Sequence, residues 1–434
     1  MKEQALGFNL IGPASVNAGL GVIMREYAKA LLAAGITVAI FDNYRVGARS
    51  GHDLTLQKYF VDELDKLPHE INIWVIGGLT IMDSGLAICA SPHLQSKFNV
   101  AFIWWETANI PPRWAVGAQA FDAIIAASEF VCETWANSVS GVPVILAPVP
   151  LSMPLEIGPD RIRFGLPVDP LLIYTGFEPA SDPVRKNPFA GIEAFRRAFP
   201  ENNDVRLVIK INNPSVEGKL HDGMARMYAM LEGDKRVILL TDSMSYKDTL
   251  SLYASCDIIM SLHRAEGLGL MPLEAMRLGK PVIATGWSGN MTYMNHCSAA
   301  LIRYELVAPD ESATHYSLSA LGVKTRWAEP SIEHAVNWLQ ALVENKSLRE
   351  DIGDHARMHT AAYDLVARQL NFVKELAALL RNKYLQPAKN FTLLNSRIKK
   401  ADRQPIFTHN GRIRVDLVRR RLRVAFDRHV SWRF

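Results

Sequence analysis

Two successive series of short apolar runs constrain the fold of this chain more than any other feature. The first series comprises residues 5–12, 37–42, 71–77, 100–106, 123–128 and 142–148. The second comprises residues 171–176, 205–211, 236–241, 256–262, 281–285 and 299–303. Runs that are apolar almost throughout are typical of strands buried on both faces of a parallel sheet. Amphipathic stretches between them, such as 20–35 and 187–199, predict helices, so the sequence predicts two doubly wound α/β domains.

The boundary between the two predicted domains falls in the proline-rich segment 148–170. We expect a Rossmann-like first domain over 1–160, a second over 161–360, a crossover helix over 361–385 and a basic C-terminal extension over 386–434. Ligands of such sheets bind outside the carboxyl ends of the strands. The expected site is therefore the cleft in which the two domains face each other.

Composition excludes several other classes of protein. The four cysteines lie far apart without a CxxC pair, which argues against a disulfide scaffold or a zinc site. No apolar run approaches the ~18–20 residues of a transmembrane helix, and the first residues lack the apolar core of a signal peptide. We therefore expect a cytoplasmic protein.

The stretch AEGLGLMPLEAMRLGKPVIATGWSGN (265–290) contains two glutamates, Glu266 and Glu274. A proline and a glycine bound a predicted helix over 270–279. Glu266 is then expected on the preceding loop and Glu274 in the first helical turn, where the helix dipole favours a negative charge. Carboxylates beside exposed amides suit a ligand that is part sugar and part diphosphate. Either glutamate alone is equally well interpreted as a dipole partner or a solvated loop residue.

EGLGLMPLEAMRLGKPVIAT (266–285) resembles the E-x7-E segment of glycosyltransferase family 4, the retaining glycosyltransferases of the GT-B fold, also described as glycosyl transferases group 1. The resemblance implies an acceptor-binding first domain and a second domain that binds a nucleotide-sugar donor. It implies that Glu274 accepts hydrogen bonds from the donor ribose. It also implies that Glu266 contacts the hexose, assisted by the amides of Gly267, Leu268, Gly269 and Leu270. The SGN at 288–290 matches the residues that come after this motif in many members.

A second match concerns the basic residues. PVRKNPFAGIEAFRRAF (183–199) is similar to the donor-phosphate segment of the family and implies that Lys186 binds the diphosphate. Many members carry a Gly-Arg pair after the first strand of the second domain, where this chain has Gly176-Phe177. Arg185, or Lys210 at the end of the run 205–211, would then supply the second cation. The alternative for each is an ordinary surface cation.

The glycine-rich stretch GPASVNAGLGVIMREYAKAL (12–31) resembles the loop before the first helix in the same family. Gly19 and Gly21 are expected to let the backbone approach the donor, and the helix N-terminus favours a phosphate. The dinucleotide pattern G-x-G-x-x-G fails at Met24, but Asp42 ends the second predicted strand where a dinucleotide fold holds a ribose. A nicotinamide-dependent oxidoreductase therefore remains an alternative for this half.

FIWWETANIPPRW (102–114) follows a predicted strand and is expected to face the cleft. Indole rings stack on sugars, so Trp104 and Trp105 are candidates for acceptor binding, with core packing as the alternative. Glu106 resembles an acceptor-side polar residue of the family and is a candidate for binding the acceptor or stabilising charge. His263 is a weaker candidate for donor binding, because a lone histidine is more often structural. No D-x-D motif occurs, so we expect neither a metal nor a resident cofactor.

The end of the chain is strongly basic. Residues 381–434 contain 15 Lys and Arg against 3 Asp and Glu, whereas the whole chain carries a net charge of only +4. Cations interleaved with Val, Leu, Phe and Trp suit an anionic membrane surface. A partner-docking helix or a solubilising tail is the alternative, and no nucleic-acid-binding motif accompanies the charge.

The sequence thus predicts a cytoplasmic retaining hexosyltransferase, positioned at the inner face of the membrane. The donor would be a UDP- or GDP-hexose and the acceptor a saccharide or lipid-linked glycan of a surface polysaccharide or glycolipid. Glu266, Lys186 and Glu106 are expected to carry the reaction. Two alternatives stay open, which are the oxidoreductase and a non-catalytic glycan-binding protein on a transferase scaffold.

Overall fold

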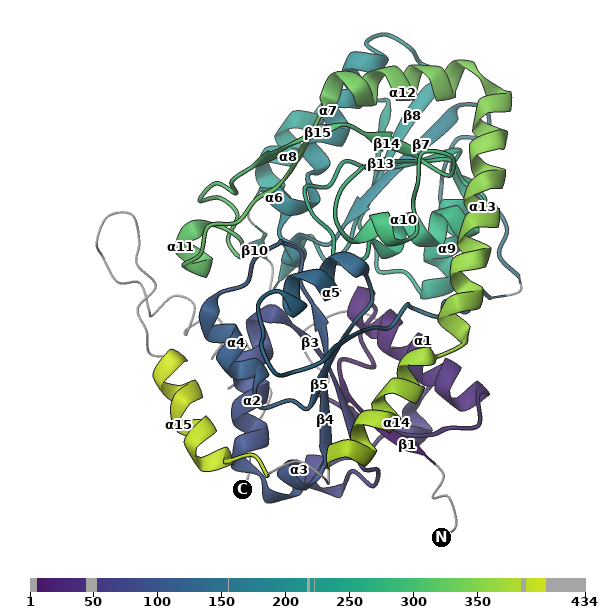
Figure 1. Ribbon diagram of the computed structural model, residues 1–434. Helices are drawn as coiled ribbons and strands as arrows, with labels where there is room; N and C mark the ends of the chain where they lie inside the picture. Colours follow the sequence, from purple (N-terminus) through teal and green to yellow (C-terminus); the bar gives the residue numbers. More distant parts are fainter. Residues whose placement is uncertain are drawn as a thin grey trace.

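The computed structural model describes residues 6–43, 53–154, 156–216, 219–221, 223–383 and 388–402. Two α/β domains lie one above the other, each built on a six-stranded parallel sheet (Figure 1). The first sheet has the order β2-β1-β3-β4-β5-β6. Its strands are β1 (Gly7–Gly12), β2 (Thr37–Asp42), β3 (Ile71–Gly77), β4 (Phe98–Trp104), β5 (Ala123–Ala126) and β6 (Val144–Leu146).

The second sheet has the order β11-β8-β7-β12-β13-β14. Its strands are β7 (Leu171–Phe177), β8 (Val205–Ile211), β11 (Val237–Leu240), β12 (Ile258–Ser261), β13 (Val282–Thr285) and β14 (Ala300–Ile302). The order reverses between β7 and β12, which pair directly. In open α/β sheets this reversal is where ligands bind.

Helices cover both sheets. Those of the first domain are α1 (Gly19–Ala33), α2 (Ile81–Ala90), α3 (Pro92–Ser96), α4 (Pro112–Ala118) and α5 (Glu129–Ala136). Those of the second are α6 (Pro183–Lys186), α7 (Pro188–Ala198), α8 (Met224–Leu231), α9 (Tyr246–Ser255), α10 (Leu270–Arg277), α11 (Leu318–Leu321) and α12 (Ile332–Glu344). Three more follow in the chain, α13 (Lys346–Arg368), α14 (Asn371–Lys383) and α15 (Phe391–Asp402).

Several observed elements have other bounds than predicted, and two of these differences concern the strand before Glu106 and the long helical pattern 348–384. The run 100–106 predicts a strand, but β4 ends at Trp104, because its partner strand β3 ends at Gly77, which pairs with Trp104. Glu106 therefore lies on a loop beyond the sheet. The helical pattern 348–384 is divided into α13 and α14 at Leu370, whose φ of 50° cannot continue a helix.

The chain returns to the first domain after α13 (Figure 1). On α14, Phe372 packs edge-on against Tyr27 with ring centroids 5.7 Å apart, and Lys383 Nζ donates to Asp122 Oδ2 at 3.0 Å. Helix α15 buries Leu394, Ile398 and Ala401 in the first-domain core. Residues 391–402 of the predicted basic extension are therefore a packed helix, and residues 403–434 lie outside the described residues.

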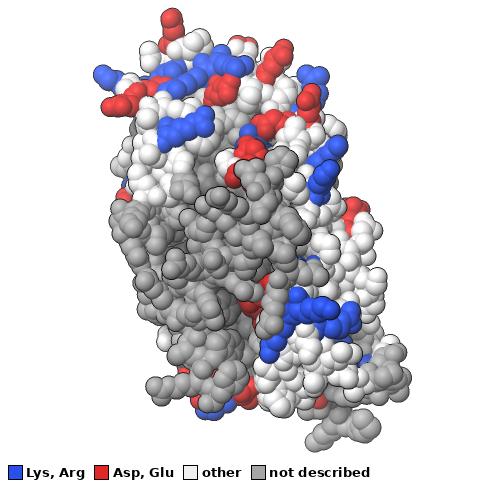
Figure 2. Space-filling view, turned by 90° about the vertical axis from the view of Figure 1, so that its left-hand side faces the viewer, with Lys and Arg blue, Asp and Glu red and all other residues white. Residues whose placement is uncertain are grey.

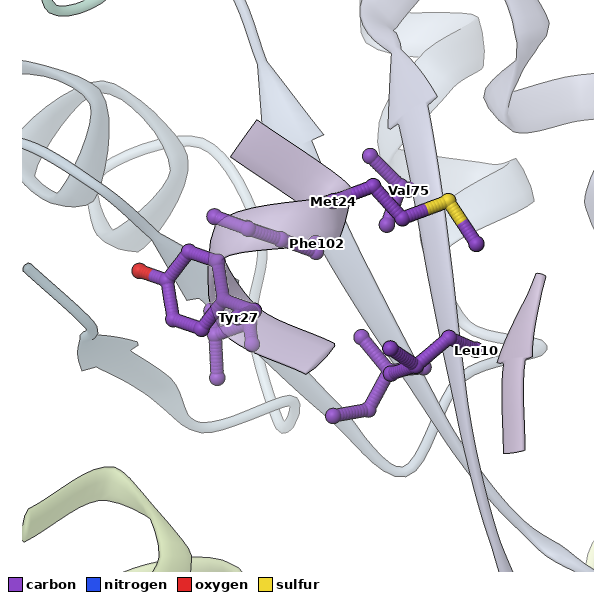
Figure 3. A pocket seen from close by; sticks show the side chains of 7 residues that line it. Leu10, Met24, Tyr27, Val75 and Phe102 are labelled. Carbon is purple, nitrogen blue, oxygen red and sulfur yellow. The ribbon is translucent and has the colours of Figure 1, made fainter. Parts of the chain in front are cut away.

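A small apolar cavity lies between α1 and the first sheet. Figure 3 shows the Tyr27 ring in its wall, with the hydroxyl turned away from the other labelled side chains. Its lining consists of Leu10, Met24, Tyr27, Ile73, Val75, Phe102 and Ile125. No charged group lines it, so it belongs to the core. Within the described ranges no helix is long and apolar enough to cross a bilayer.

Candidate active site

The loops after β7 and β12 lie side by side at the strand-order reversal of the second sheet. Arg264 N donates to Arg185 O at 2.8 Å, and Asn187 Nδ2 donates to Leu262 O at 3.0 Å. These bonds fix the segment of Arg185 and Lys186 against the segment of Glu266. The two segments that the sequence singles out for donor binding therefore form one site.

Glu266 forms ion pairs with both predicted cations of this site. Lys186 Nζ donates to Glu266 Oε1 at 2.5 Å, and Arg185 Nη1 lies 3.3 Å from Glu266 Oε2. The Arg185 side chain is 4% exposed and that of Lys186 is 24% exposed. Lys186 is therefore the cation that solvent and ligands reach, whereas Arg185 lies behind it and orients the carboxylate.

The charges of this cluster control its titration. Burial raises the pKa of Glu266, but Lys186 and Arg185 outweigh burial and lower that pKa to about 2. Burial lowers the pKa of Lys186, opposed by Glu266. Glu266 is consequently an anion at neutral pH, and one carboxylate faces two cations. The ammonium of Lys186, whose side chain is 24% exposed, is therefore the group of this cluster that an anionic ligand can pair with.

Asp182 shapes the loop that presents the two cations. It is buried and adopts a φ of 70°, which is rare for a residue other than glycine. Its Oδ1 accepts from the N–H groups of Val184 at 3.0 Å and Arg185 at 3.3 Å, which caps the short helix α6. The strained backbone and the cap together direct the side chains of Arg185 and Lys186 toward Glu266.

Glu106 approaches this cluster from the first domain. Its Oε1 lies 3.9 Å from Arg185 Nη2, and its Oε2 accepts from the Tyr316 hydroxyl at 2.7 Å. Glu106 and Glu266 therefore face one guanidinium from opposite domains. The three side chains expected to carry the reaction, with Arg185, form a single charged cluster.

The loop between the two motif glutamates is more enclosed than the sequence predicts. Residues 266–269 are buried, so their amides are not exposed as expected. Ser128 Oγ of the first domain donates to Gly267 O at 2.6 Å, and a Cβ at Gly289 would lie 2.1 Å from Gly267 O. Gly269 has a φ of 82°, which requires glycine. These glycines serve close backbone packing as well as any ligand contact.

The prediction that Glu274 lies in the first turn of its helix is wrong. Helix α10 begins at Leu270, which places Glu274 in the second turn, fully enclosed. Burial raises the pKa of Glu274, the Tyr246 hydroxyl opposes this and the charge of Glu26 adds to it, and the result is a pKa of about 8. Glu274 Oε1 and Tyr246 Oη each lack a hydrogen-bond partner of normal geometry among the described residues. Glu274 Oε1 is thus an acceptor enclosed by protein, and its contact with a donor ribose stays a prediction.

The raised pKa of Glu274 predicts a pH-dependent effect of Glu274→Gln. The folded chain holds this proton up to about pH 8, whereas the unfolded chain releases it near the ordinary value of 4.5. Wild-type stability therefore falls between these values as pH rises, by at most about 1.4 kcal/mol per pH unit from this group. Thermal unfolding should show that the stability of the variant, relative to that of wild type, increases from about pH 5 to about pH 8. Glu344→Gln, at an exposed position, is the control, and a pH-independent difference would contradict the assignment.

His263 and the SGN segment support the loop. His263 is fully buried, and burial lowers its pKa. Its Nε2 lies 3.1 Å from Asn290 Oδ1, and Ser288 Oγ accepts from Glu266 N at 2.8 Å. His263 therefore contacts protein groups on both sides in this structure, and a donor contact remains a prediction.

Lys210 lies in different surroundings from the Lys186 cluster. Its Nζ donates to Asn212 Oδ1 at 2.6 Å, and burial lowers its pKa to about 8, opposed by Glu178 and Asp242. Arg185 pairs with Glu266 directly, whereas the described hydrogen bonds of Lys210 Nζ go to Ile211 O and Asn212 Oδ1. Of the two candidates for the missing cation, Arg185 is the one that the geometry favours.

The remaining predicted residues come from the first domain. Gly19 begins α1 on the surface, while a Cβ at Gly21 would lie 2.1 Å from Val16 O, so Gly21 tightens the loop. Trp105 is buried edge-on against Trp114 with ring centroids 4.6 Å apart. Trp104 is also buried, and its Nε1 has no hydrogen-bond partner within the described chain. Neither indole presents a free face here, so their acceptor role stays a prediction.

Three residues of this site were missed by the sequence interpretation. They are Tyr316, Asp182 and Ser128. Ser128 ends a predicted strand, and strand-end polar residues signal a site in such sheets. Tyr316 and Asp182 carry no motif, because their roles depend on contacts between segments that are distant in sequence.

The comparisons with known proteins agree with this geometry. The family described as Glycosyl transferases group 1 matches residues 181–312, which include Lys186, Glu266 and Glu274. A search of curated proteins gave no match.

Solved structures resemble the fold over most of the chain. Sucrose-phosphate synthase from Thermosynechococcus elongatus is 15% identical, with a TM-score of 0.59 over 86% of this chain and 99% of that one. HepE from Anabaena, solved with UDP and glucose, is 14% identical, with a TM-score of 0.57 over 86% and 100%. The lipopolysaccharide outer core galactosyltransferase WaaB is 14% identical, with a TM-score of 0.54 over 86% and 99%. The chain therefore has the GT-B fold and matches group 1 glycosyl transferases over residues 181–312 of its second domain, which supports nucleotide-sugar-dependent glycosyl transfer.

Proposed function

We propose that this protein is a retaining glycosyltransferase that transfers a hexose from a nucleotide diphosphate sugar to a hydroxyl of a saccharide or lipid-linked glycan. The observation that carries the proposal is the pairing of Lys186 and Arg185 with Glu266 at the strand-order reversal of a GT-B second domain. Lys186, the partly exposed cation of this cluster, suits the diphosphate of an anionic donor. UDP or GDP is the expected nucleotide, and surface polysaccharide or glycolipid assembly the expected setting.

The donor diphosphate would compete with Glu266 for the ammonium of Lys186. A phosphate oxygen offers Lys186 a stronger charge than one carboxylate, so Lys186 would turn to the diphosphate. Glu266 would then accept hydrogen bonds from the hexose while Arg185 keeps it in place. Glu274, whose buried Oε1 has no partner among the described residues, would accept from the ribose hydroxyls of a donor that reaches it.

The reaction itself requires positioning and charge stabilisation more than a nucleophile. In the family that the sequence resembles, the leaving phosphate oxygen assists deprotonation of the acceptor on the same face of the sugar. Lys186 would stabilise the charge that develops on that diphosphate. Glu106, which reaches the cluster from the first domain, would face the acceptor. We propose that no metal is needed, since the cations supply the charge that an ion would otherwise provide.

A thermal-shift screen against UDP-, GDP-, ADP- and TDP-sugars, with NAD(H) alongside, tests the proposal. A ligand at a hundred times its Kd stabilises the folded state by about 2.7 kcal/mol. We expect one class of nucleotide sugar to raise the unfolding temperature and NAD(H) to leave it unchanged. Stabilisation by NAD(H) alone would favour the oxidoreductase alternative. Sugar-nucleotide binding without any release of nucleotide would favour the non-catalytic scaffold.

We also propose that the protein works in the cytoplasm and that its basic end contacts an anionic membrane surface. On the face that Figure 2 shows, one group of Lys and Arg side chains lies in the lower half, and others, mixed with Asp and Glu, lie in the upper half. Arg397, Lys399 and Lys400 are exposed on α15. Each cation near an anionic surface contributes about 1 kcal/mol.

Removal of residues 403–434 should lower binding to vesicles that contain phosphatidylglycerol. The cut begins at 403 because α15 packs on the first domain. Binding measured by vesicle sedimentation should fall severalfold, while vesicles of phosphatidylcholine alone serve as the control. Equal sedimentation of the truncated and full chains would contradict the membrane proposal.

A further inference from the structure

A segment of the second domain reaches across to the first. We call residues 304–330 the arm. It contains β15 (Tyr304–Val307), α11 and β16 (Trp327–Pro330), and β15 pairs antiparallel with β16. Figure 1 shows α11 extending from the second domain toward the first. Asn109 Nδ2 donates to Lys324 O at 3.0 Å, and Arg113 Nη1 donates to Leu321 O at 3.4 Å. The arm therefore contacts the loop and helix that follow β4.

The base of the arm is fixed to the two loops that carry Arg185 and Glu266. Arg264 Nε donates to Glu329 Oε2 at 2.5 Å, and Arg264 Nη1 donates to Val184 O at 2.6 Å. Ala328 N donates to Arg264 O at 2.9 Å. A residue on the arm is thus held in a constant relation to the segments of Arg185 and Glu266.

Tyr316 of the arm touches residues from both domains. Its hydroxyl donates to Glu106 Oε2 at 2.7 Å. Its ring lies 5.1 Å from the Trp105 ring at an angle of 31° and 5.7 Å from the Arg185 guanidinium. Tyr316 itself is 5% exposed.

We propose that Tyr316 is the positioning residue that holds Glu106 of the first domain in register with the Arg185–Glu266–Lys186 cluster of the second. The inference rests on the proposed function, in which Glu106 faces the acceptor. Without the hydroxyl, the guanidinium 3.9 Å away is the only charged group that restrains the Glu106 carboxylate among the described ion pairs. An ion pair at that distance does not fix the direction of the two oxygens, whereas a hydrogen bond does.

The titration of Tyr316 is consistent with this role. Burial raises the pKa of the phenol, Arg185 opposes this and Glu106 adds to it. The hydroxyl therefore remains protonated, and so remains a donor, throughout the range in which Glu106 is to act. The link between the two domains is then present at every working pH.

Tyr316→Phe keeps the ring against Trp105 and Arg185 and removes only the donor. The thermal-shift screen selects the sugar nucleotide, and methyl α- and β-hexosides serve as acceptor probes. We expect kcat for transfer to fall about tenfold, the cost of one hydrogen bond to a charged group. We expect the KM for the sugar nucleotide to stay within about twofold, because the hydroxyl does not touch the donor segments. Tyr304→Phe, on the same arm with an exposed ring, is the matched control and should behave as wild type.

A double-mutant cycle separates this role from a purely structural one. If Tyr316 acts through Glu106, Tyr316→Phe should cost little in a Glu106→Ala background, which lacks the acceptor, so the two losses should not add. Losses that multiply independently, or a Tyr316→Phe variant with wild-type kcat, would overturn the inference and leave the proposed function intact. A wild-type protein that releases no nucleotide from any sugar donor would overturn both. A Tyr316→Phe loss confined to the donor KM would also contradict the inference.

Discussion

Lys186→Ala is expected to lower kcat/KM for the nucleotide sugar by about a hundredfold or more. Loss of one preorganised group that stabilises developing charge typically costs about 10²–10³ in rate. Lys186 is the more exposed of the two cations on Glu266, so it is the side chain of this pair that the proposed diphosphate would contact. The measurement is nucleotide release at saturating and limiting donor, which separates kcat from KM.

The matched control for this variant is Lys346→Ala, since Lys346 begins α13 with a side chain that is 78% exposed. The control should retain wild-type rates. A conservative Lys186→Arg variant should recover part of the activity, because the charge returns with a different geometry. Full activity of Lys186→Ala would remove this residue from the diphosphate site.

Glu266→Gln is expected to reduce both turnover and stability. The variant leaves the buried Arg185 and the partly exposed Lys186 without their shared anion, and removing one member of a buried ion pair typically costs about 3–5 kcal/mol. Turnover should fall about a hundredfold, because the amide cannot accept from hexose hydroxyls as a carboxylate does. Thermal unfolding and nucleotide release measure the two effects separately.

The stability loss should depend on pH in a defined direction. The folded pKa of Glu266 is about 2, below the ordinary 4.5, so its contribution is fully present above about pH 4.5 and is lost as pH falls toward 2. The difference in the free energy of unfolding between wild type and Glu266→Gln should therefore be constant near neutral pH and become smaller in acid. Glu305→Gln, at an exposed position on β15, should show neither effect. A difference that widens in acid would contradict the ion-pair assignment.

The sequence predicts the fold well because both sheets are buried on two faces. Runs such as 37–42, 71–77 and 205–211 coincide with β2, β3 and β8. Where the prediction is wrong, pairing rather than apolarity sets the boundary, as at the end of β4. The division between α13 and α14 depends on one backbone angle at Leu370, which no periodicity reveals.

The candidate site is predictable where each residue belongs to a recognisable contiguous motif. Lys186 and Glu266 belong to two different motifs of this kind, and the structure pairs them. The choice between Arg185 and Lys210 is not predictable, because it depends on where each side chain leaves its own element. The role of Tyr316 is not predictable from the sequence either, because its partner Glu106 belongs to the other domain. The raised pKa of Glu274 follows from its burial, which an argument from the helix dipole does not take into account.

The return of the chain through α14 and α15 has a consequence for biosynthesis. The surfaces around Tyr27 and beneath Ile398 receive these helices only after the whole second domain has been translated. At about 5–20 residues per second, they remain uncovered on the ribosome for an interval on the order of tens of seconds. The domain that begins first is therefore completed last, and a fragment that ends near residue 160 would expose those apolar surfaces permanently.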